Sequence, residues 1–157
     1  MNDFILTDSL FCKLVKSIPA DKTINHIKVQ GHGSSMSPFL KNNETLFIKP
    51  VKKKTEIKTG DIIAVTDKNE EKIIVHRVIS QKKNICLLKG DNCKKKDGWF
   101  TKKQVLGIIT QKKKQSGKII CFFRWESILI AFLSKTGFLN SILLPFGRLL
   151  KIKLQRF

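Results

Sequence analysis

The sequence has no cysteines at the close spacing of a metal site, and this absence limits the chemistry open to it. Four cysteines are present, and none of them forms a Cys-x-x-Cys pair. Structural zinc sites use such pairs, and a chain of 157 residues can bury a core without disulfides. We therefore expect no metal, no disulfide framework and no cofactor. Cys12 and Cys121 lie in apolar runs, which favours burial as small hydrophobic side chains.

Acidic residues are also scarce, with 12 Asp and Glu against 31 Lys and Arg, for a net charge of +19. Such an excess favours an acidic partner, either nucleic acid or an anionic lipid surface. Only four of the basic residues are arginine, the side chain whose planar fork reads bases and phosphates. The lysines occur in short runs, such as residues 94–96 and 112–114, which are typical of solvated loops. The composition therefore argues against nucleic acid as the partner.

Long apolar runs are absent as well. The longest uncharged stretch near the C-terminus, residues 136–147, is shorter than the roughly 20 residues that span a bilayer. Residues 1–19 lack the basic start and the continuous apolar core of a secretory signal. Their apolar residues instead recur at helical spacing, so we expect a short amphipathic helix within residues 1–20 that ends before Pro19.

The C-terminal segment, residues 118–157, is predicted to form apolar and basic helices. Gly137 and Pro145 interrupt its helical pattern and predict two or three pieces. Such a segment can lie in a membrane interface or can cover a protein core. Because basic residues are attracted to anionic lipid, we expect a peripheral, membrane-associated protein, and otherwise a cytoplasmic one. A polar stripe with a seven-residue repeat runs along the segment and consists of Ser127, Ser134, Ser141 and Arg148.

Between these ends, residues 24–117 predict a single β-rich domain. Turn signals separate short runs that are rich in β-branched residues. Short strands at such intervals indicate a mainly β fold, a compact antiparallel barrel-like or folded sheet. The predicted strands are residues 27–30, 45–49, 62–66, 72–80, 85–89 and 105–110.

The stretch GHGSSMSPFL, residues 31–40, contains two adjacent serines that are candidate nucleophiles. A serine hydroxyl needs a base within hydrogen-bonding distance, and that base needs a third group to orient it. Of the three histidines, His32 is in the same stretch, His26 begins a predicted strand, and His76 lies inside the apolar run IIVHRVI. A histidine within a hydrophobic strand is costly unless it is used. From the residues alone, His76 is either a core histidine with satisfied hydrogen bonds or a functional base.

Five short sequences occur in a fixed order: GSSMSPFL, GDIIAV, VHRVI, LLKGDN followed by Asp97, and VLGII. This order resembles the signal peptidase I family of serine peptidases, over roughly residues 31–109. More narrowly, it resembles the branch of archaea, the endoplasmic reticulum and sporulating bacteria, in which histidine replaces lysine as the general base. The resemblance places the nucleophile on Ser35, directly before a methionine, the base on His76 and the acid on Asp97. Asp91, in the KGDN turn, is the second choice for orienting the base.

The same resemblance gives roles to the residues around the nucleophile. Gly33 stands where many relatives have a serine that assists the oxyanion hole, so Ser34 or a backbone amide is expected to compensate. Met36 and Pro38 are expected to shape the turn and the substrate groove. Typical members also have a membrane-spanning helix before the serine box, where this chain has only its amphipathic segment.

We therefore expect a serine endopeptidase that cleaves leader or precursor peptides after small residues. Its partners would be the peptide or precursor-protein substrate and an anionic membrane surface. Histidine at residue 76 argues against the lysine-based main bacterial branch and against self-cleaving SOS-type repressors, whose base is also a lysine. The alternative is a catalytically inactive basic module that uses a peptidase-like fold to bind anionic lipid or nucleic acid.

Overall fold

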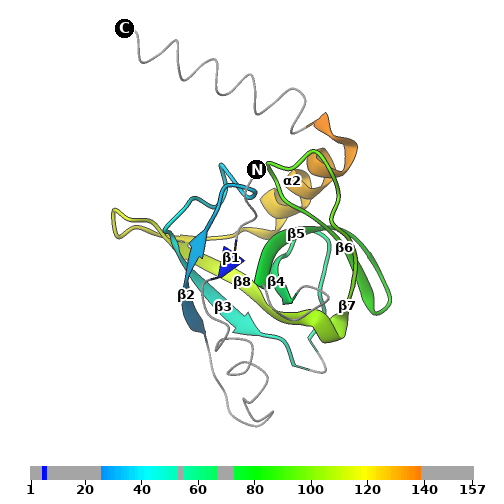
Figure 1. The fold of residues 1–157 in the computed structure, drawn as a ribbon, viewed down its shortest axis with the longest axis horizontal. Coiled ribbons are helices and arrows are strands. Elements are labelled where there is room, and N and C mark those ends of the chain that lie inside the picture. Colours follow the sequence, from blue (N-terminus) through cyan, green and yellow to red (C-terminus); the bar gives the residue numbers. More distant parts are fainter. Residues whose placement is uncertain (1–4, 7–25, 53–54, 67–72, 139–157) are drawn as a thin grey trace, which may run out of the picture.

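The computed structural model describes residues 5–6, 26–52, 55–66 and 73–138. These residues form one nine-stranded sheet, a short 3-10 helix and one α-helix (Figure 1). The helices are η1 (Lys102–Gln104) and α2 (Arg124–Thr136). The strands are β1 (Ile5–Leu6), β2 (Ile27–His32), β3 (Thr45–Pro50), β4 (Ile62–Thr66), β5 (Ile73–Lys82), β6 (Ile85–Lys89), β7 (Gly98–Thr101), β8 (Val105–Lys113) and β9 (Ile119–Cys121).

Every strand pairing is antiparallel, and the strand order is β1-β2-β3-β8-β4-β5-β6-β7, with β9 paired to β8. The short strand β1 pairs with β2 on one side and with β5 on the other. The pairing path from β2 through β3, β8 and β4 to β5 therefore returns to β2 through β1. Helix α2 packs against β5, next to the end of the sheet from which the loop after β2 projects (Figure 1).

The position of β4 in the sheet explains why its sequence, IIAVT, does not alternate between polar and apolar residues. All five of its residues are buried, because both faces of the strand are covered. Ile62 and Ala64 belong to one hydrophobic cluster, and Ile63 and Val65 belong to a second cluster on the opposite face. The second cluster also contains Ile57, Val78, Cys86, Leu88 and Val105.

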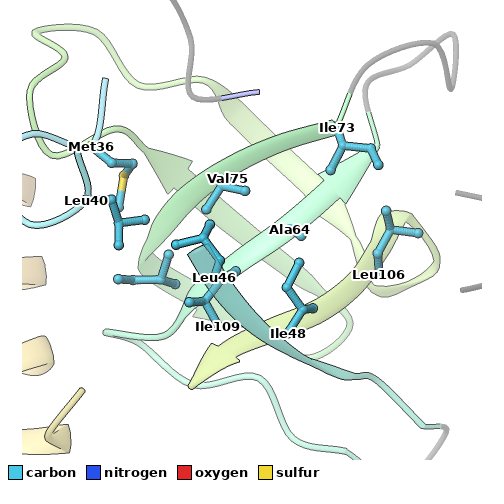
Figure 2. Close-up of a cluster of buried hydrophobic side chains, with 10 residues drawn as sticks. Met36, Leu40, Leu46, Ile48, Ala64, Ile73, Val75, Leu106 and Ile109 are labelled. Atoms are coloured by element: carbon cyan, nitrogen blue, oxygen red, sulfur yellow. The ribbon is translucent and has the colours of Figure 1, made fainter. Parts of the chain in front are cut away.

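The first cluster reaches from the sheet into the loop that follows β2. Figure 2 shows Met36 and Leu40 of this loop beside Leu46 and Val75 of the sheet. Met36 and Leu40 are both fully buried. The hydrophobic core thus fixes the chain on the C-terminal side of residue 35, and the position of that residue depends on packing as much as on local turn geometry.

The prediction of a mainly β, antiparallel fold is confirmed, and β4 and β6 have the predicted bounds. The prediction of an N-terminal helix is wrong at Ile5–Leu6, which form a strand because their backbone groups pair with two neighbouring strands. The rest of that predicted helix lies outside the described residues. Strands β7 and β9 were not predicted from the sequence.

The prediction of several apolar C-terminal helices is not supported. The described residues contain one such helix, α2, preceded by strand β9 in a region predicted to be helical, while residues 139–157 lie outside the described part. No helix in the described ranges is long and apolar enough to cross a bilayer. Cys121 is exposed, so its predicted burial is wrong, because β9 is paired on one side and half open to solvent. Cys12 lies outside the described residues.

Candidate active site

Ser35 lies in the turn between β2 and β3, and the residue is fully buried. Two residues earlier, Gly33 has a φ of +114°, a conformation that L side chains rarely adopt. Its amide donates a hydrogen bond to Asn42 Oδ1 at 3.1 Å. The turn continues with the Ser37 amide donating to the carbonyl oxygen of Ser34 at 3.1 Å. Glycine at position 33 therefore serves the backbone path that leads to Ser35.

His76 lies on β5, opposite Ile63 of β4, and only 1% of the residue is exposed. Its Nε2 is 2.8 Å from Ser35 Oγ, within hydrogen-bonding distance. The histidine that contacts Ser35 thus comes from the hydrophobic strand rather than from the serine loop. His32 ends β2, and His26 is exposed and makes an edge contact with the ring of Phe47.

Asp97 lies between β6 and β7, and its Oδ2 is 2.7 Å from Nδ1 of His76. The backbone positions this carboxylate, because the Asp97 amide donates to the carbonyl oxygen of Leu88 at 2.9 Å. A carboxylate accepts a hydrogen bond, so the proton of a neutral His76 is on Nδ1 and its Nε2 is an acceptor. The Ser35 hydroxyl can then donate to Nε2, which is the arrangement that general-base catalysis requires.

Asp91, the second choice for orienting the base, has a different partner. Its two carboxylate oxygens accept hydrogen bonds from Nε and Nη2 of Arg77, at 2.8 and 2.7 Å. Both side chains are buried, and Nη1 of Arg77 donates to the carbonyl oxygen of Gly60 at 3.0 Å. A buried guanidinium needs a counter-charge, and Asp91 provides it. The structure therefore brings Ser35, His76 and Asp97 together and assigns Asp91 to the neighbouring arginine.

The segment after β6 also forms hydrogen bonds to the backbone of Ser34 and Ser35. The Asn92 amide donates to the carbonyl oxygen of Ser35 at 2.7 Å, and Asn92 Nδ2 donates to that of Ser34 at 3.1 Å. Gly90 is packed so closely that an added Cβ would lie 2.9 Å from both His76 Nε2 and the Ser35 carbonyl oxygen. Only a residue without a side chain fits there unless the chain shifts.

A second buried ion pair supports the far side of the serine loop. Nζ of Lys112 lies 2.9 Å from Glu44 Oε2 and also donates to the carbonyl oxygen of Phe39. Glu44 in turn accepts a hydrogen bond from the Lys41 amide at 2.9 Å. The sequence placed Lys112 in a solvated lysine run. Because β8 extends to Lys113, Lys112 instead points into the protein, where it is 5% exposed.

Lys89 is a further buried lysine near the site, 2% exposed, and its Nζ donates to the carbonyl oxygen of Ser134 at 2.6 Å. Burial lowers the pKa of this ammonium, while the carboxylate of Asp91 opposes the shift. The bond lies near the C-terminal end of α2, where a cation is stabilised by the helix carbonyls. Lys89 thus joins α2 to the strand that leads to Asp97.

The remaining residues predicted for the site have different environments. Ser34 is exposed, next to the buried Ser35. Met36 packs in the core, and Pro38 is exposed after a cis peptide bond with Ser37. The expected roles of Met36 and Pro38 in shaping the turn and the substrate groove stay predictions.

Sequence reasoning missed four of the residues that build this site. One signal was present for Arg77, since an arginine within an apolar strand needs an acidic partner. The missed residues are Arg77, Gly90, Asn92 and Lys112.

The described residues contain no group of three or more His, Cys, Asp or Glu side chains that could hold a metal ion.

Comparison with known proteins gives one match. Residues 13–120 match the family model described as Peptidase S24-like, which covers more than half of the chain and includes Ser35, His76 and Asp97. No curated protein and no solved structure matches the chain.

Proposed function

The chain belongs to the Peptidase S24-like family, and on this premise we propose that it is a serine endopeptidase of the signal-peptidase type. Its substrates are leader or precursor peptides, which it cleaves after small residues. The observation that supports this proposal is the continuous pair of hydrogen bonds from Ser35 Oγ to His76 and from His76 to Asp97, at 2.8 and 2.7 Å.

The reaction follows from this geometry. His76 Nε2 accepts the hydroxyl proton as Ser35 Oγ attacks the scissile carbonyl carbon, and Asp97 stabilises the imidazolium that forms. The tetrahedral intermediate collapses to an acyl-serine ester when His76 transfers its proton to the departing amine. A water molecule then loses a proton to His76 and attacks the ester, which releases the acid product and regenerates the Ser35 hydroxyl.

The type of base supports the signal-peptidase assignment. In the Ser-His branch that this sequence resembles, the base comes from a V-H-R-V strand, and here that strand is β5 with His76. In the lysine-based branch and in self-cleaving repressors, a lysine would be needed at this position. Lys89, the buried lysine next to the site, instead makes a hydrogen bond to the backbone of α2.

The burial of the site has a consequence for access. Ser35 is 0% and His76 1% exposed, whereas the Asp97 side chain is 24% exposed. A peptide therefore reaches the Ser35 hydroxyl only after the residues packed around Ser35 and His76 move, as loops do in many enzymes. We expect a small serine-reactive probe to label Ser35 faster than a bulky one of the same reactivity.

Cleavage and labelling by the full chain test the proposal, with Ser34 as a matched control. Ser35→Ala is expected to lower peptide cleavage by about 10⁴-fold to 10⁶-fold and to abolish labelling by a fluorophosphonate probe. Ser34→Ala removes the exposed neighbouring hydroxyl and should leave cleavage within a few-fold of wild type. His76→Ala should suppress labelling of Ser35, because the hydroxyl loses its base.

Retained cleavage by Ser35→Ala, or equal labelling of wild type and His76→Ala, would rule out this mechanism. Salt-sensitive binding of anionic lipid or nucleic acid by a wild-type chain that cleaves nothing would favour the inactive binding module instead. Mass spectrometry of the chain incubated alone distinguishes cleavage of itself from cleavage of an added precursor peptide.

A further inference from the structure

Helix α2 is oriented opposite to an ordinary surface helix. The residues that it buries are small, Ser127, Ala131 and Ser134. Its outward residues are large and apolar, at the spacing of one helical face. They are Trp125 (68% exposed), Ile128 (44%), Leu129 (51%) and Phe132 (62%).

This orientation has a structural cause. The helix lies against β5, where small side chains allow close approach, and Lys89 fixes its end through the Ser134 carbonyl oxygen. Ser127 and Ser134, the two residues of the predicted polar stripe that the structure describes, are therefore on the face that meets the protein, and the bulky apolar residues point outward. Phe123 (60% exposed) and Phe138 (44% exposed) extend the apolar surface beyond the two ends of the helix.

The apolar surface continues into a hollow of about 680 Å³ between α2 and the serine loop. Trp125, Leu129 and Leu133 of α2 line it together with Pro38 and Phe39, which follow Ser35 by three and four residues. Large apolar side chains that gather on one exposed face in this way mark a site of contact. The contact surface is thus next to the candidate active site.

The charges around this surface select the kind of partner. Lys41 and Lys114 line the hollow along with the acidic Glu126, and Lys135 is exposed on α2 itself. From residue 123 onward the sequence has six basic residues and one acidic residue. Apolar and aromatic side chains flanked by cations match the interface of an anionic bilayer, where tryptophan prefers the headgroup level and basic residues meet lipid phosphates.

We propose that the outward face of α2, formed by Trp125, Ile128, Leu129 and Phe132, docks in the plane of an anionic membrane interface. The hollow beside it receives lipid acyl chains at the same level. This docking places the serine loop next to the lipid surface. The inference does not depend on whether Ser35 is catalytic.

The two tryptophans of the chain provide the test. Trp125 is on the proposed surface, whereas Trp99 is 45% exposed on the edge strand β7, away from α2 (Figure 1). Trp99→Phe leaves Trp125 as the sole fluorophore, and Trp125→Phe leaves Trp99. With vesicles of phosphatidylcholine and phosphatidylglycerol, Trp125 emission should shift to the blue and be quenched by brominated acyl chains. Trp99 emission should change little, and pure phosphatidylcholine should give a much smaller response from Trp125.

Substitutions on the face make the test quantitative. Leu129→Ser with Phe132→Ser should weaken vesicle binding at least ten-fold, whereas Trp99→Ser, at a 45%-exposed position on β7, should leave it unchanged. Circular dichroism verifies that each variant is folded.

Three results would each overturn the proposal. The first is Trp125 emission that is already blue-shifted in buffer and unchanged by vesicles, which means that the chain itself covers the face. The second is a shift in buffer that increases with protein concentration as the mass doubles, which means that a second copy covers it. The third is vesicle binding that quenches Trp99 rather than Trp125, which means that another surface meets the lipid.

Discussion

Two consecutive residues of β5, His76 and Arg77, point to opposite faces of the strand, and each is paired with an aspartate from the same segment. Asp97 meets His76 through one contact of 2.7 Å, and its side chain is 24% exposed. Asp91 meets Arg77 through two hydrogen bonds, and its side chain is fully buried. The same kinds of groups thus form one pair that borders solvent and one that does not.

The two pairs differ in whether they can change protonation state. A histidine can gain and lose a proton near neutral pH, whereas an arginine in a protein stays charged. The Arg77–Asp91 pair therefore has no state to switch to, and it fixes the geometry of β5 against the segment after β6. In the proposed reaction His76 takes up a proton and forms an ion pair with Asp97. The partial exposure of Asp97 leaves solvent close to this ion pair.

Of the substitutions that separate these two pairs, Asp97→Asn is expected to have the largest effect. An amide cannot fix the tautomer with a proton on Nδ1 of His76, so kcat for peptide cleavage should fall by about 10⁴-fold. The free energy of unfolding, measured by urea denaturation, should change by less than about 1 kcal/mol, because Asp97 is partly solvated. A variant that keeps a tenth or more of wild-type kcat would show that Asp97 does not orient the base.

The second-largest effect is expected from Asp91→Ala, which breaks the buried Arg77–Asp91 pair. Removing one partner leaves Arg77 charged and buried, which should lower the free energy of unfolding by about 3–5 kcal/mol. Glu56→Ala breaks the exposed pair with Lys58, which measures 3.2 Å, and should cost less than about 1 kcal/mol. Urea denaturation of both variants gives the comparison.

Replacing both partners, as in Arg77→Met with Asp91→Leu, should recover much of the stability lost in Asp91→Ala, because no unpaired charge remains. A loss in Asp91→Ala as small as that in Glu56→Ala would show that the Arg77–Asp91 pair is dispensable.

A smaller loss of stability than in Asp91→Ala, about 1–3 kcal/mol, is expected from Gly90→Ala, because Gly90 lies between the two pairs and an added side chain has no room there. A new Cβ would lie 2.9 Å from His76 Nε2, so the chain between Asp91 and Asp97 has to shift and kcat should fall as well. Gly117→Ala is the control, since Gly117 has a φ of +83° with nothing near an added Cβ. It should cost about 1 kcal/mol and leave kcat unchanged. Equal kcat in both variants would mean that the Gly90 contact does not position the base.

Local patterns in the sequence were sufficient for most of the sheet. The uninterrupted apolar run of β4 and the short run of β6 are bounded by turn residues, so their ends could be predicted. Strand β7 was missed because it has only four residues, GWFT, which alternate between half-buried and exposed. The helical spacing of residues 1–20 did not predict that Ile5–Leu6 pair between two strands, since that pairing depends on distant chain segments.

The candidate site divides in the same way. The resemblance of the motifs indicated Ser35, His76 and Asp97, and the structure brings these three side chains together. The choice of partner for Asp91 depends on the register of β5, and the burial of Lys112 depends on how far β8 extends. The outward face of α2 was also beyond prediction, because a helix with one polar stripe does not specify which side meets the sheet.

The hydrogen bond from the Asn92 amide to the Ser35 carbonyl oxygen, together with the burial of Met36, has a consequence for the entropy of the reaction. Both constraints are formed when the chain folds, so the backbone of Ser35, the proposed nucleophile, has little freedom left to lose when a substrate binds. The ordering that a flexible serine loop would require at each turnover occurs here once, during folding.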